Sequence, residues 1–370
     1  AHQYISINSL NFSAIDNLVG GNDTDTLSYA AYSTGVTINL DAGTATGLTS
    51  LGGIENIIGG SGSDEITGDA GNNLLNGGAG DDTFYFLNGW GADTVTDSSG
   101  NDTLNFSAVT VDLTFDIGAS SVTDGSNTVT HSSIENFTGG NGADRFVFVD
   151  GASVAGAIDG HAGTDTLDFS AMTTTRAVML AALGSVDGFA GKATSIGGTF
   201  DNINDVIAGT AGTDRLTGAN LPALWELDGS DTYTASGRTL TFAAYEALYG
   251  GSAADTFELS GAQSYPINAG AGNDVLLMNT GASYSGVFNG QTGSDTLSYA
   301  GRATAVTANL TTRTGIDITG SYLDVENLAG GSSVDTLTGD SAANILNGGL
   351  GNDTLIGAGG NDIYQFNDGW

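Results

Sequence analysis

The spacing of apolar and polar positions along this chain predicts short strands. Between Gly59 and Tyr85 three blocks of nine residues follow one another, GGSGSDEIT, GDAGNNLLN and GGAGDDTFY, and each has one large apolar residue at its eighth position. Four further blocks occupy residues 330–365, GGSSVDTLT, GDSAANILN, GGLGNDTLI and GAGGNDIYQ. The last residues of each block suffice for one short strand, whose apolar side chain points inward and stacks on its neighbours.

The first six residues of each block are expected to turn tightly. Glycine at the first, second and fourth positions allows a positive φ without a Cβ penalty. If each block is half a coil of a solenoid, turns two blocks apart lie side by side, which pairs Asp64 with Asp82, Asp335 with Asp353 and Asn344 with Asp362. The predicted fold class is all-β, a right-handed parallel β-roll or β-solenoid with additional outer strands and loops.

The stacked turns predict calcium sites. Calcium takes about six to eight hard oxygen ligands, which adjacent turns supply from backbone carbonyls and from the residue at position six. We therefore predict that several calcium ions are bound by turn glycines and position-six residues, namely Gly60, Gly62, Asp64, Asn73, Gly78, Gly80, Asp82, Asp93, Asp102, Asp144, Asp165, Asp295, Asp335, Asn344, Gly349, Gly351, Asp353 and Asp362. For Asn73 and Asn344 a plain turn without metal is the alternative, because Asp is expected there.

The charge of the chain supports cation binding. Asp and Glu number 42 against 7 Lys and Arg, the formal net charge is −35, and 35 of the acidic residues are Asp. Self-repulsion opposes compaction of the metal-free chain, so folding is expected to be coupled to calcium binding. Nucleic acid is excluded as a partner by the same charge. There is no cysteine, and no apolar run is long enough for membrane insertion.

One repeat extends along the chain. The sequence GGNDTDTLSYA at residues 20–30 recurs as GQTGSDTLSYA at residues 290–300. We interpret residues 1–370 as one elongated solenoid, with a block run at 59–105, a degenerate solenoid with long excursions at 106–329 and a second block run at 330–365. Further single blocks between the runs place Asp214, Asp231, Asp255 and Asp274 at position six.

A second motif, of the type IENIIGG, precedes several blocks and is called the IEN motif below. It begins at Ile15, Ile54, Ile134, Tyr245 and Val325, and its second residue is acidic in each copy. Two roles are open for this acid, calcium ligation and acceptance of backbone N–H bonds at a coil corner. The Asn that follows in most copies is expected to bond along the solenoid axis. Excursions such as residues 35–43 are expected to add strands outside the solenoid.

The sequence contains no catalytic signature, and we expect no enzyme. The motifs HExxH and GxSxG are absent, and His161 lies inside a turn. Paired carboxylates resemble a glycosidase pair only superficially, because a repeated residue has a repeated role. Trp90 and Trp370 occupy equivalent places and are expected to be structural.

The quoted blocks, together with DTLSYA, VTINL and IENIIGG, resemble the repeat regions of large bacterial RTX proteins, which carry the hemolysin-type calcium-binding nonapeptide. The resemblance covers most of residues 10–370 and implies an extracellular, calcium-dependent protein exported by type I secretion. Adhesins, toxins, proteases, lipases and surface-layer proteins share such repeats.

Three functions follow from this resemblance. The leading hypothesis is a structural or adhesive segment of a surface protein, filament or matrix, with end-to-end self-association and a surface carbohydrate or protein as its ligand. The alternatives are the repeat portion of a secreted hydrolase or carbohydrate-active enzyme, and a surface-layer subunit.

Overall fold

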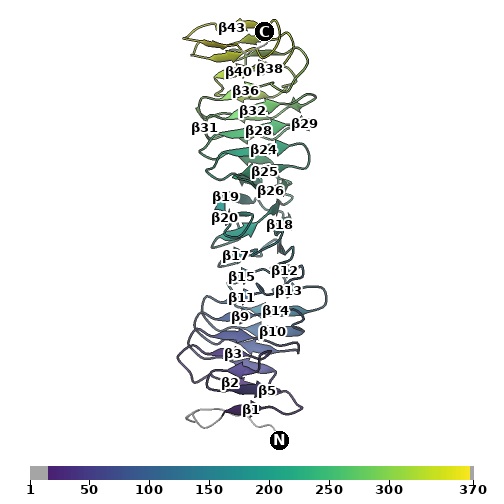
Figure 1. Cartoon of the computed structure of the whole chain (residues 1–370), viewed down its shortest axis with the longest axis vertical. Helices are drawn as coiled ribbons and strands as arrows, with labels where there is room; N and C mark the ends of the chain where they lie inside the picture. Colours follow the sequence, from purple (N-terminus) through teal and green to yellow (C-terminus); the bar gives the residue numbers. More distant parts are fainter. Residues whose placement is uncertain (1–15, 367–370) are drawn as a thin grey trace. The chain divides into compact units, whose positions relative to one another are not determined.

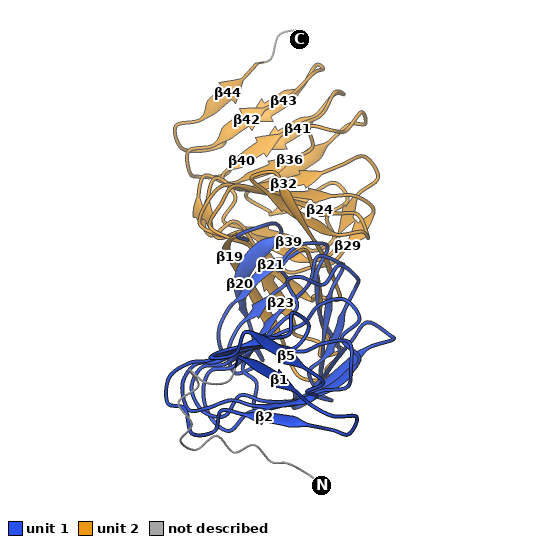
Figure 2. Cartoon of the chain, turned by 60° about the horizontal axis from the view of Figure 1, so that its bottom comes forward, with its two compact units in different colours: residues 1–171, 184–203 blue, residues 172–183, 204–370 orange. Residues whose placement is uncertain are grey.

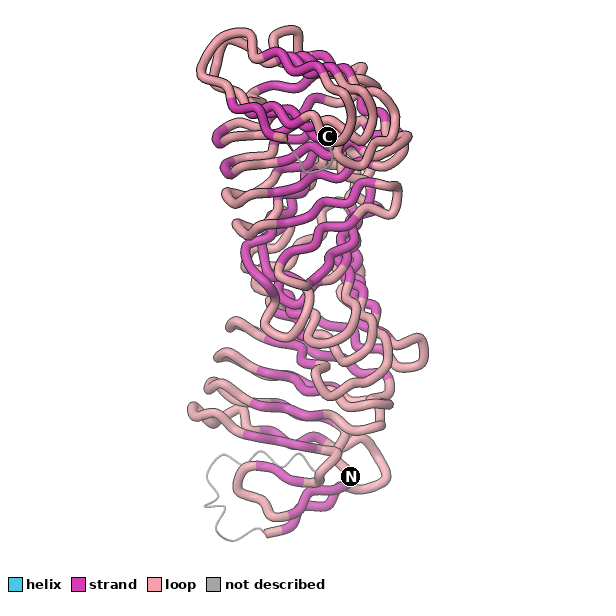
Figure 3. The backbone as a smooth tube through the Cα atoms, turned by 45° about the horizontal axis from the view of Figure 1, so that its top comes forward, coloured by secondary structure: helices cyan, strands magenta, loops and turns pink. Residues whose placement is uncertain are grey.

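The computed structural model describes residues 16–366, which form strands and turns without a helix (Figure 3). No described segment is a helix that is long and apolar enough to cross a membrane. The chain divides into two compact units, unit 1 with residues 1–171 and 184–203 and unit 2 with residues 172–183 and 204–370 (Figure 2). The boundaries of these units differ from those of the segments 59–105, 106–329 and 330–365. Those segments were distinguished in the sequence by how closely they match the nonapeptide pattern. A single continuous solenoid stays a prediction.

Unit 1 consists mainly of two sheets to which successive blocks contribute in turn. The first has the order β2 (Thr26–Ser28), β6 (Asn56–Ile58), β8 (Leu74–Asn76), β10 (Ala92–Thr96), β14 (Thr128–Ser132), β13 (Ser121–Thr123), β12 (Thr114–Asp116), β16 (Arg145–Val149) and β18 (Thr166–Ala171). The second has the order β4 (Thr44–Ala45), β3 (Thr37–Asn39), β7 (Glu65–Thr67), β9 (Thr83–Tyr85), β11 (Thr103–Asn105), β15 (Asn136–Thr138), β17 (Ile158–Asp159), β21 (Phe200–Ile203) and β20 (Phe189–Ala193). A short pair joins β1 (Asn17–Val19) to β5 (Ser50–Gly52).

Unit 2 repeats this arrangement. One sheet has the order β22 (Asp205–Ile207), β26 (Arg238–Ala243), β25 (Thr232–Ala235), β24 (Ala223–Leu227), β28 (Asp255–Leu259), β32 (Val275–Met278), β36 (Thr296–Ser298), β40 (Asn327–Ala329), β42 (Ile345–Asn347) and β44 (Ile363–Gln365). Opposite it lie β19 (Ala177–Leu183), β23 (Arg215–Thr217), β27 (Ala247–Tyr249), β30 (Ile267–Asn268), β34 (Val287–Asn289) and β39 (Ser321–Leu323), then β38 (Thr314–Gly315), β37 (Thr307–Asn309), β41 (Thr336–Thr338) and β43 (Thr354–Ile356). Two short pairs join β29 (Ala262–Gln263) to β33 (Ser283–Tyr284) and β31 (Ala271–Gly272) to β35 (Thr292–Gly293).

The nonapeptide is half a coil, as predicted. In the first block run the strands alternate between the two sheets, so that β7 pairs in parallel with β9, and β6 with β8. Ile66 lies opposite Phe84, and Phe84 lies opposite Leu104, each with no exposed surface. The strands of consecutive coils therefore lie one above another within each unit (Figure 1). This confirms the all-β, parallel β-roll class.

The excursions differ from the expectation that they lie outside the solenoid. The first strand of an excursion is itself part of a coil: Ile38 of β3 pairs in parallel with Ile66, and Ala308 of β37 with Leu337. In these two excursions the returning strands β4 and β38 are the antiparallel additions. In the excursion after Val109, β13 is antiparallel to both β12 and β14. The reason is the single apolar residue at the centre of each first strand, which is buried just as in a nonapeptide.

Aromatic side chains fill part of the interior of both units. In unit 1 the Phe86 and Phe106 rings stack with centroids 4.5 Å apart, and Trp90, only 2 % exposed, packs edge-on against Phe106. In unit 2 Trp225 is fully buried and stacks on Phe257. Trp90 therefore has the structural role expected of it, whereas Trp370 lies outside the described residues.

This packing predicts unequal effects of truncation. We expect Phe106→Ala to lower the free energy of unfolding by about 3 to 5 kcal/mol, because a buried aromatic leaves a cavity in a stack that cannot collapse. Val111→Ala, at a side chain that is 45 % exposed, serves as control and should cost less than about 0.5 kcal/mol. Guanidinium titration in calcium, followed by circular dichroism, measures both. Equal losses would contradict the role given to the stack.

Candidate metal centre

The position-six carboxylates form columns, because each accepts a backbone N–H from the coil before it. In unit 1 the Asp64 N–H donates to Asp82 Oδ1 at 2.7 Å, and the Asp82 N–H donates to Asp102 Oδ1 at 2.8 Å. In unit 2 the same bond joins Asp335 to Asp353 at 2.9 Å and Asn344 to Asp362 at 3.0 Å. The three residue pairs that the block spacing predicted are therefore neighbours in space.

The same acceptor geometry holds the other predicted ligands. In each case the Oδ1 atom accepts a backbone N–H group. The donor and acceptor pairs are Asn73 and Asp93 at 2.8 Å, Leu113 and Asp144 at 2.9 Å, Asp144 and Asp165 at 2.9 Å, Asp274 and Asp295 at 2.8 Å, and Val306 and Asp335 at 2.8 Å. Each of these aspartates is almost fully buried. The column is thus a regular feature of both units.

Where an excursion follows a block of the column, the acidic residue of the next IEN motif accepts the backbone N–H of the position-six aspartate. Glu135 Oε2 accepts the Asp102 N–H at 2.9 Å and Glu326 Oε2 accepts the Asp295 N–H at 2.8 Å. Glu55 and Glu246 accept from Asp25 and Asp214 in the same way. Of the two roles left open for this acid, the structure shows the hydrogen-bond acceptor. Ile15, the start of the first copy, lies outside the described residues.

The Asn of the IEN motif bonds along the stack, as expected. Asn136 Nδ2 donates to the Asp102 carbonyl at 3.2 Å on one side, and its Oδ1 accepts the Ala157 N–H at 2.9 Å on the other. Asn327 bridges Asp295 and Ile345 in the same manner. The amide therefore connects three successive coils.

The second carboxylate oxygen, Oδ2, occurs in two states. In the first, which we call closed, it accepts a backbone N–H group of its own turn. Asp64 Oδ2 accepts the Gly60 N–H at 2.7 Å, and Asp335 Oδ2 accepts the Gly331 N–H at 2.6 Å. Asp144 bonds Gly140 in the same way. In these blocks, which directly follow an IEN motif, both carboxylate oxygens already accept hydrogen bonds.

In the second state, which we call open, Oδ2 accepts no hydrogen bond. Oδ2 is buried and has no hydrogen-bond partner in Asp82, Asp93, Asp102, Asp274 and Asp295. In most of these blocks the position-two residue has a positive φ, 106° at Gly78 and 66° at Gln291, which turns its N–H away from the carboxylate. A buried anionic oxygen without a donor is costly unless it gains a proton or a cation. Carboxylate and carbonyl oxygens are the hard donors that calcium prefers, so the open carboxylates fit calcium.

The turn glycines have two different roles. Gly78, Gly80, Gly349 and Gly351 have the positive φ that was predicted. Gly60 and Gly62 do not, and a Cβ there would instead collide with the backbone at Tyr32 and at Thr34. Close approach of neighbouring coils, not handedness of the turn, requires glycine at these two positions.

Three position-six residues make different contacts. The Asn73 and Asn344 Oδ1 atoms accept the N–H groups of Asp69 and Asp340 at 2.9 and 2.8 Å, the contacts of a plain turn, and their role as ligands stays a prediction. Asp231 was wrongly assigned to a block, since it lies in the hairpin turn between β24 and β25 and accepts the N–H groups of Asp228 and Gly229.

Burial shifts the titration of the columns. It raises the pKa of Asp82 to about 8, with the neighbouring Asp64 and Asp97 carboxylates adding to the effect. Burial likewise raises the pKa of Asp93 to about 7 and of Asp165 to about 8. These carboxyl groups favour the proton-bearing form in the absence of a cation, and a bound cation replaces the proton.

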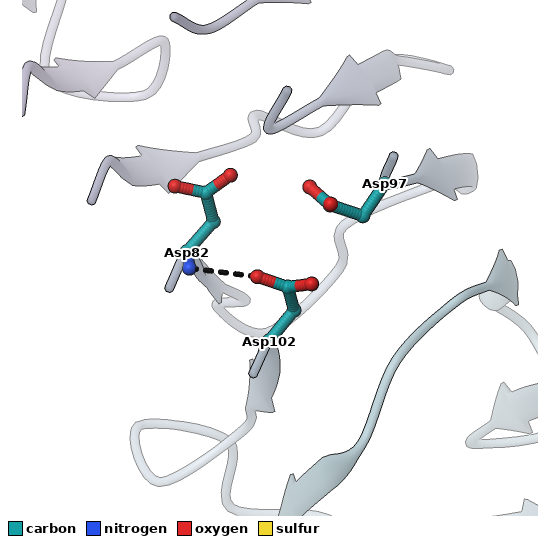
Figure 4. A group of neighbouring side chains, drawn as sticks. All are labelled: Asp82, Asp97 and Asp102. Atoms are coloured by element: carbon teal, nitrogen blue, oxygen red, sulfur yellow. Dashed lines mark hydrogen bonds between the residues drawn. The ribbon is translucent and has the colours of Figure 1, made fainter. Parts of the chain in front are cut away.

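One carboxylate that the sequence analysis missed joins a column. Asp97 occupies the first position of the block at 97–105, where most blocks have glycine. One oxygen each of Asp82, Asp97 and Asp102 lies within 4.8 Å of the others (Figure 4). The signal in the sequence was the acid in a glycine position.

The raised pKa values predict a pH dependence of the metal-free protein. Asp82, Asp93 and Asp165 have folded-state pKa values of about 7 to 8, above the value of about 4 in an unfolded chain. The folded state therefore binds more protons between pH 4 and 8, and stability falls as the pH rises through this window. In a chelator we therefore expect less folded protein, seen as a weaker strand signal in circular dichroism, at pH 8 than at pH 5.

Calcium is expected to abolish this fall, because the ion stabilises the ionised carboxylates. High salt serves as control: it screens repulsion at the surface but acts weakly on buried groups, so the fall should persist. A metal-free chain that is equally stable at pH 5 and pH 8 would contradict the assignment.

The acceptor role of the IEN acid predicts a graded effect. Glu135→Ala leaves the Asp102 N–H without its acceptor and should cost about 1 to 3 kcal/mol of unfolding free energy. Glu135→Gln keeps an acceptor oxygen and should cost less than half as much. Glu65→Ala, at an exposed position, should change stability by less than about 0.5 kcal/mol. Denaturant titration measures all three, and equal values for Glu135→Ala and Glu65→Ala would refute the role.

Comparison with known proteins agrees with this geometry. Four stretches, residues 50–85, 87–105, 201–220 and 329–364, match the family model of the RTX calcium-binding nonapeptide repeat. A search of the curated proteins found no match. The first two stretches contain the column of Asp64, Asp82 and Asp102, and the last contains Asp335 and Asp353. With its half-coil nonapeptides and buried position-six carboxylates, the chain carries RTX calcium-binding nonapeptide repeats in both units.

Proposed function

We propose that this chain is an extracellular, calcium-stabilised structural or adhesive β-solenoid that forms a section of a large surface protein, filament or matrix component. The repetition of one carboxylate column in both units carries the proposal. In unit 1 the column runs through Asp64, Asp82, Asp102 and Glu135, and in unit 2 through Asp255, Asp274, Asp295 and Glu326. A contact that is repeated from coil to coil supports the stack, whereas a reaction centre needs a unique group of residues.

Calcium acts in this proposal as the condition for folding. The net charge of −35 opposes compaction, and the open carboxylates need a cation once they are buried. Extracellular calcium modules bind with dissociation constants of about 10⁻⁴ to 10⁻³ M. A chain with such affinities stays unfolded in the cytosol, as type I secretion requires, and folds outside the cell.

The contacts of the two described histidines support a role without catalysis. Burial lowers the pKa of His131 to about 4, and its ring packs against Phe137. The His161 Nδ1 lies 3.2 Å from the Gly140 carbonyl in a turn. These contacts give both rings a role in packing and turn geometry.

The strands β43 and β44 support self-association. Tyr364, at the eighth position of its block, is 43 % exposed, whereas the eighth-position residues Leu337 and Leu346 of the preceding coils are buried. Ile363 and Ile356, at the seventh and ninth positions of their blocks, are 56 % and 46 % exposed. A further coil, from the repeats of the same protein or from a second copy, would cover them.

Calcium titration combined with single-molecule stretching tests the proposal. We expect calcium to raise the strand signal in circular dichroism cooperatively, with a midpoint of about 10⁻⁴ to 10⁻³ M. Magnesium should not substitute, because it demands a smaller octahedral site and retains its water. Calcium should also raise the force at which the chain unfolds between optical traps.

Two outcomes would overturn the proposal. If the unfolding force is the same with and without calcium, the ion does not stiffen the stack. If the calcium-loaded chain hydrolyses ester, peptide or polysaccharide substrates, the chain has a catalytic function and the structural role is incomplete.

A further inference from the structure

Asp97 lies at the boundary between two stacked turns of unit 1. It follows β10, at the first position of the block DSSGNDTLN. The neighbouring turn, two blocks earlier, begins with Gly77 and contains Asp82. The parallel pairing of β9 and β11 brings Asp82 and Asp102 next to each other, and Asp97 lies beside both (Figure 4).

Each of the three carboxylates is held through one oxygen and presents the other. The Oδ1 atoms of Asp82, Asp97 and Asp102 accept the N–H groups of Asp64, Ser99 and Asp82 at 2.7, 2.8 and 2.8 Å. The three Oδ2 atoms are buried and have no hydrogen-bond partner. Asp82 and Asp102 are each only 1 % exposed. The cluster is therefore oriented by the backbone and its inner oxygens are left without donors.

Gly77 makes room for this arrangement. A Cβ on Gly77 would collide with Asp82 Oδ2 and with Asp97 Oδ2. Both oxygens thus converge on the same point of the backbone, which only glycine allows. No Lys or Arg side chain forms an ion pair with these three aspartates among the described residues.

Unit 2 contains the matching boundary without the third carboxylate. Asp274 and Asp295 are related by the same N–H bond as Asp82 and Asp102, and their Oδ2 atoms are also buried without partners. The block of Asp295, however, begins with Gly290 where the block of Asp102 begins with Asp97. At its first position the block of Asp102 therefore has a carboxylate that the block of Asp295 lacks.

We propose that Asp82, Asp97 and Asp102 hold one calcium ion through their Oδ2 atoms, and that Asp97 makes this site bind calcium more tightly than the two-carboxylate boundaries. The proposal rests on the calcium binding proposed above for the repeats. The number of charged ligands tunes calcium affinity over several orders of magnitude. Three neighbouring carboxylates whose Oδ2 atoms are buried also lose most from having no cation. The site is therefore the first to fill.

Calcium titration of the full chain against a chromophoric chelator tests the proposal. Asp97→Asn keeps an acceptor for the Ser99 N–H but removes the charge, and Asp97→Gly restores the glycine found at most first positions. In both we expect the tightest binding step to weaken by about tenfold or more, with the weaker steps unchanged. Asp41→Asn, which removes an exposed carboxylate from the same unit, should leave every step unchanged.

Circular dichroism in saturating calcium checks that each variant folds, and if Asp97→Asn does not, Asp97→Gly decides. An unchanged tightest step in a folded Asp97 variant overturns the three-carboxylate site but leaves the proposed function intact. A wild-type chain that binds no calcium and gains no strands overturns the proposed function itself.

Discussion

The hydrogen bond from the backbone N–H of one coil to the carboxylate of the next coil is the contact on which the structure depends. It fixes the position of Asp82 over Asp64 and of Asp102 over Asp82, and thereby the register of the strands that begin at the following residues. It also requires the carboxylate to be buried, because the N–H lies in the interface between coils. Oδ1 of each aspartate accepts its hydrogen bond in this way. Oδ2 remains as the atom that can accept a further hydrogen bond, a proton or a cation.

The second oxygen connects the acidity of the chain to its function. Where a glycine N–H of the same turn is available, as for Asp64, the carboxylate is complete without metal. Where the turn has a positive φ at its second position, as at Gly78, the oxygen lacks a donor and the carboxyl group favours a proton. The apolar stacks of Ile66, Phe84 and Leu104 stabilise the coil whether or not metal is present. A cation is thus needed by the turns and not by the core, which makes the turns the part that responds to calcium.

The sequence predicted what depends on spacing and missed what depends on backbone conformation. The half-coil length, the alternation between sheets and the neighbouring pairs all follow from a nine-residue period, and the structure confirms them. The state of the second oxygen does not follow, because Gly60 and Gly78 are the same residue at the same position with different φ. The prediction that the excursions lie outside the solenoid was wrong for their first strand. That strand has only one buried apolar residue, such as Ile38, and it stands in a segment longer than a nonapeptide, so the repeat pattern does not identify it. Asp97 does not follow from the repeat pattern, because that pattern has glycine at the first position of a block.

The columns also explain how coils of unequal length stack without losing register. From Asp64 to Asp82, to Asp102 and to Glu135 the steps are 18, 20 and 33 residues, yet each step makes the same N–H to carboxylate bond. From Asp255 to Asp274, to Asp295 and to Glu326 they are 19, 21 and 31 residues. The longest step in each column ends on glutamate, whose additional methylene reaches the N–H from the displaced backbone of the IEN motif. Differences in length are therefore confined to the segments between the carboxylates, and the outer face can change while the calcium-responsive turns stay in line.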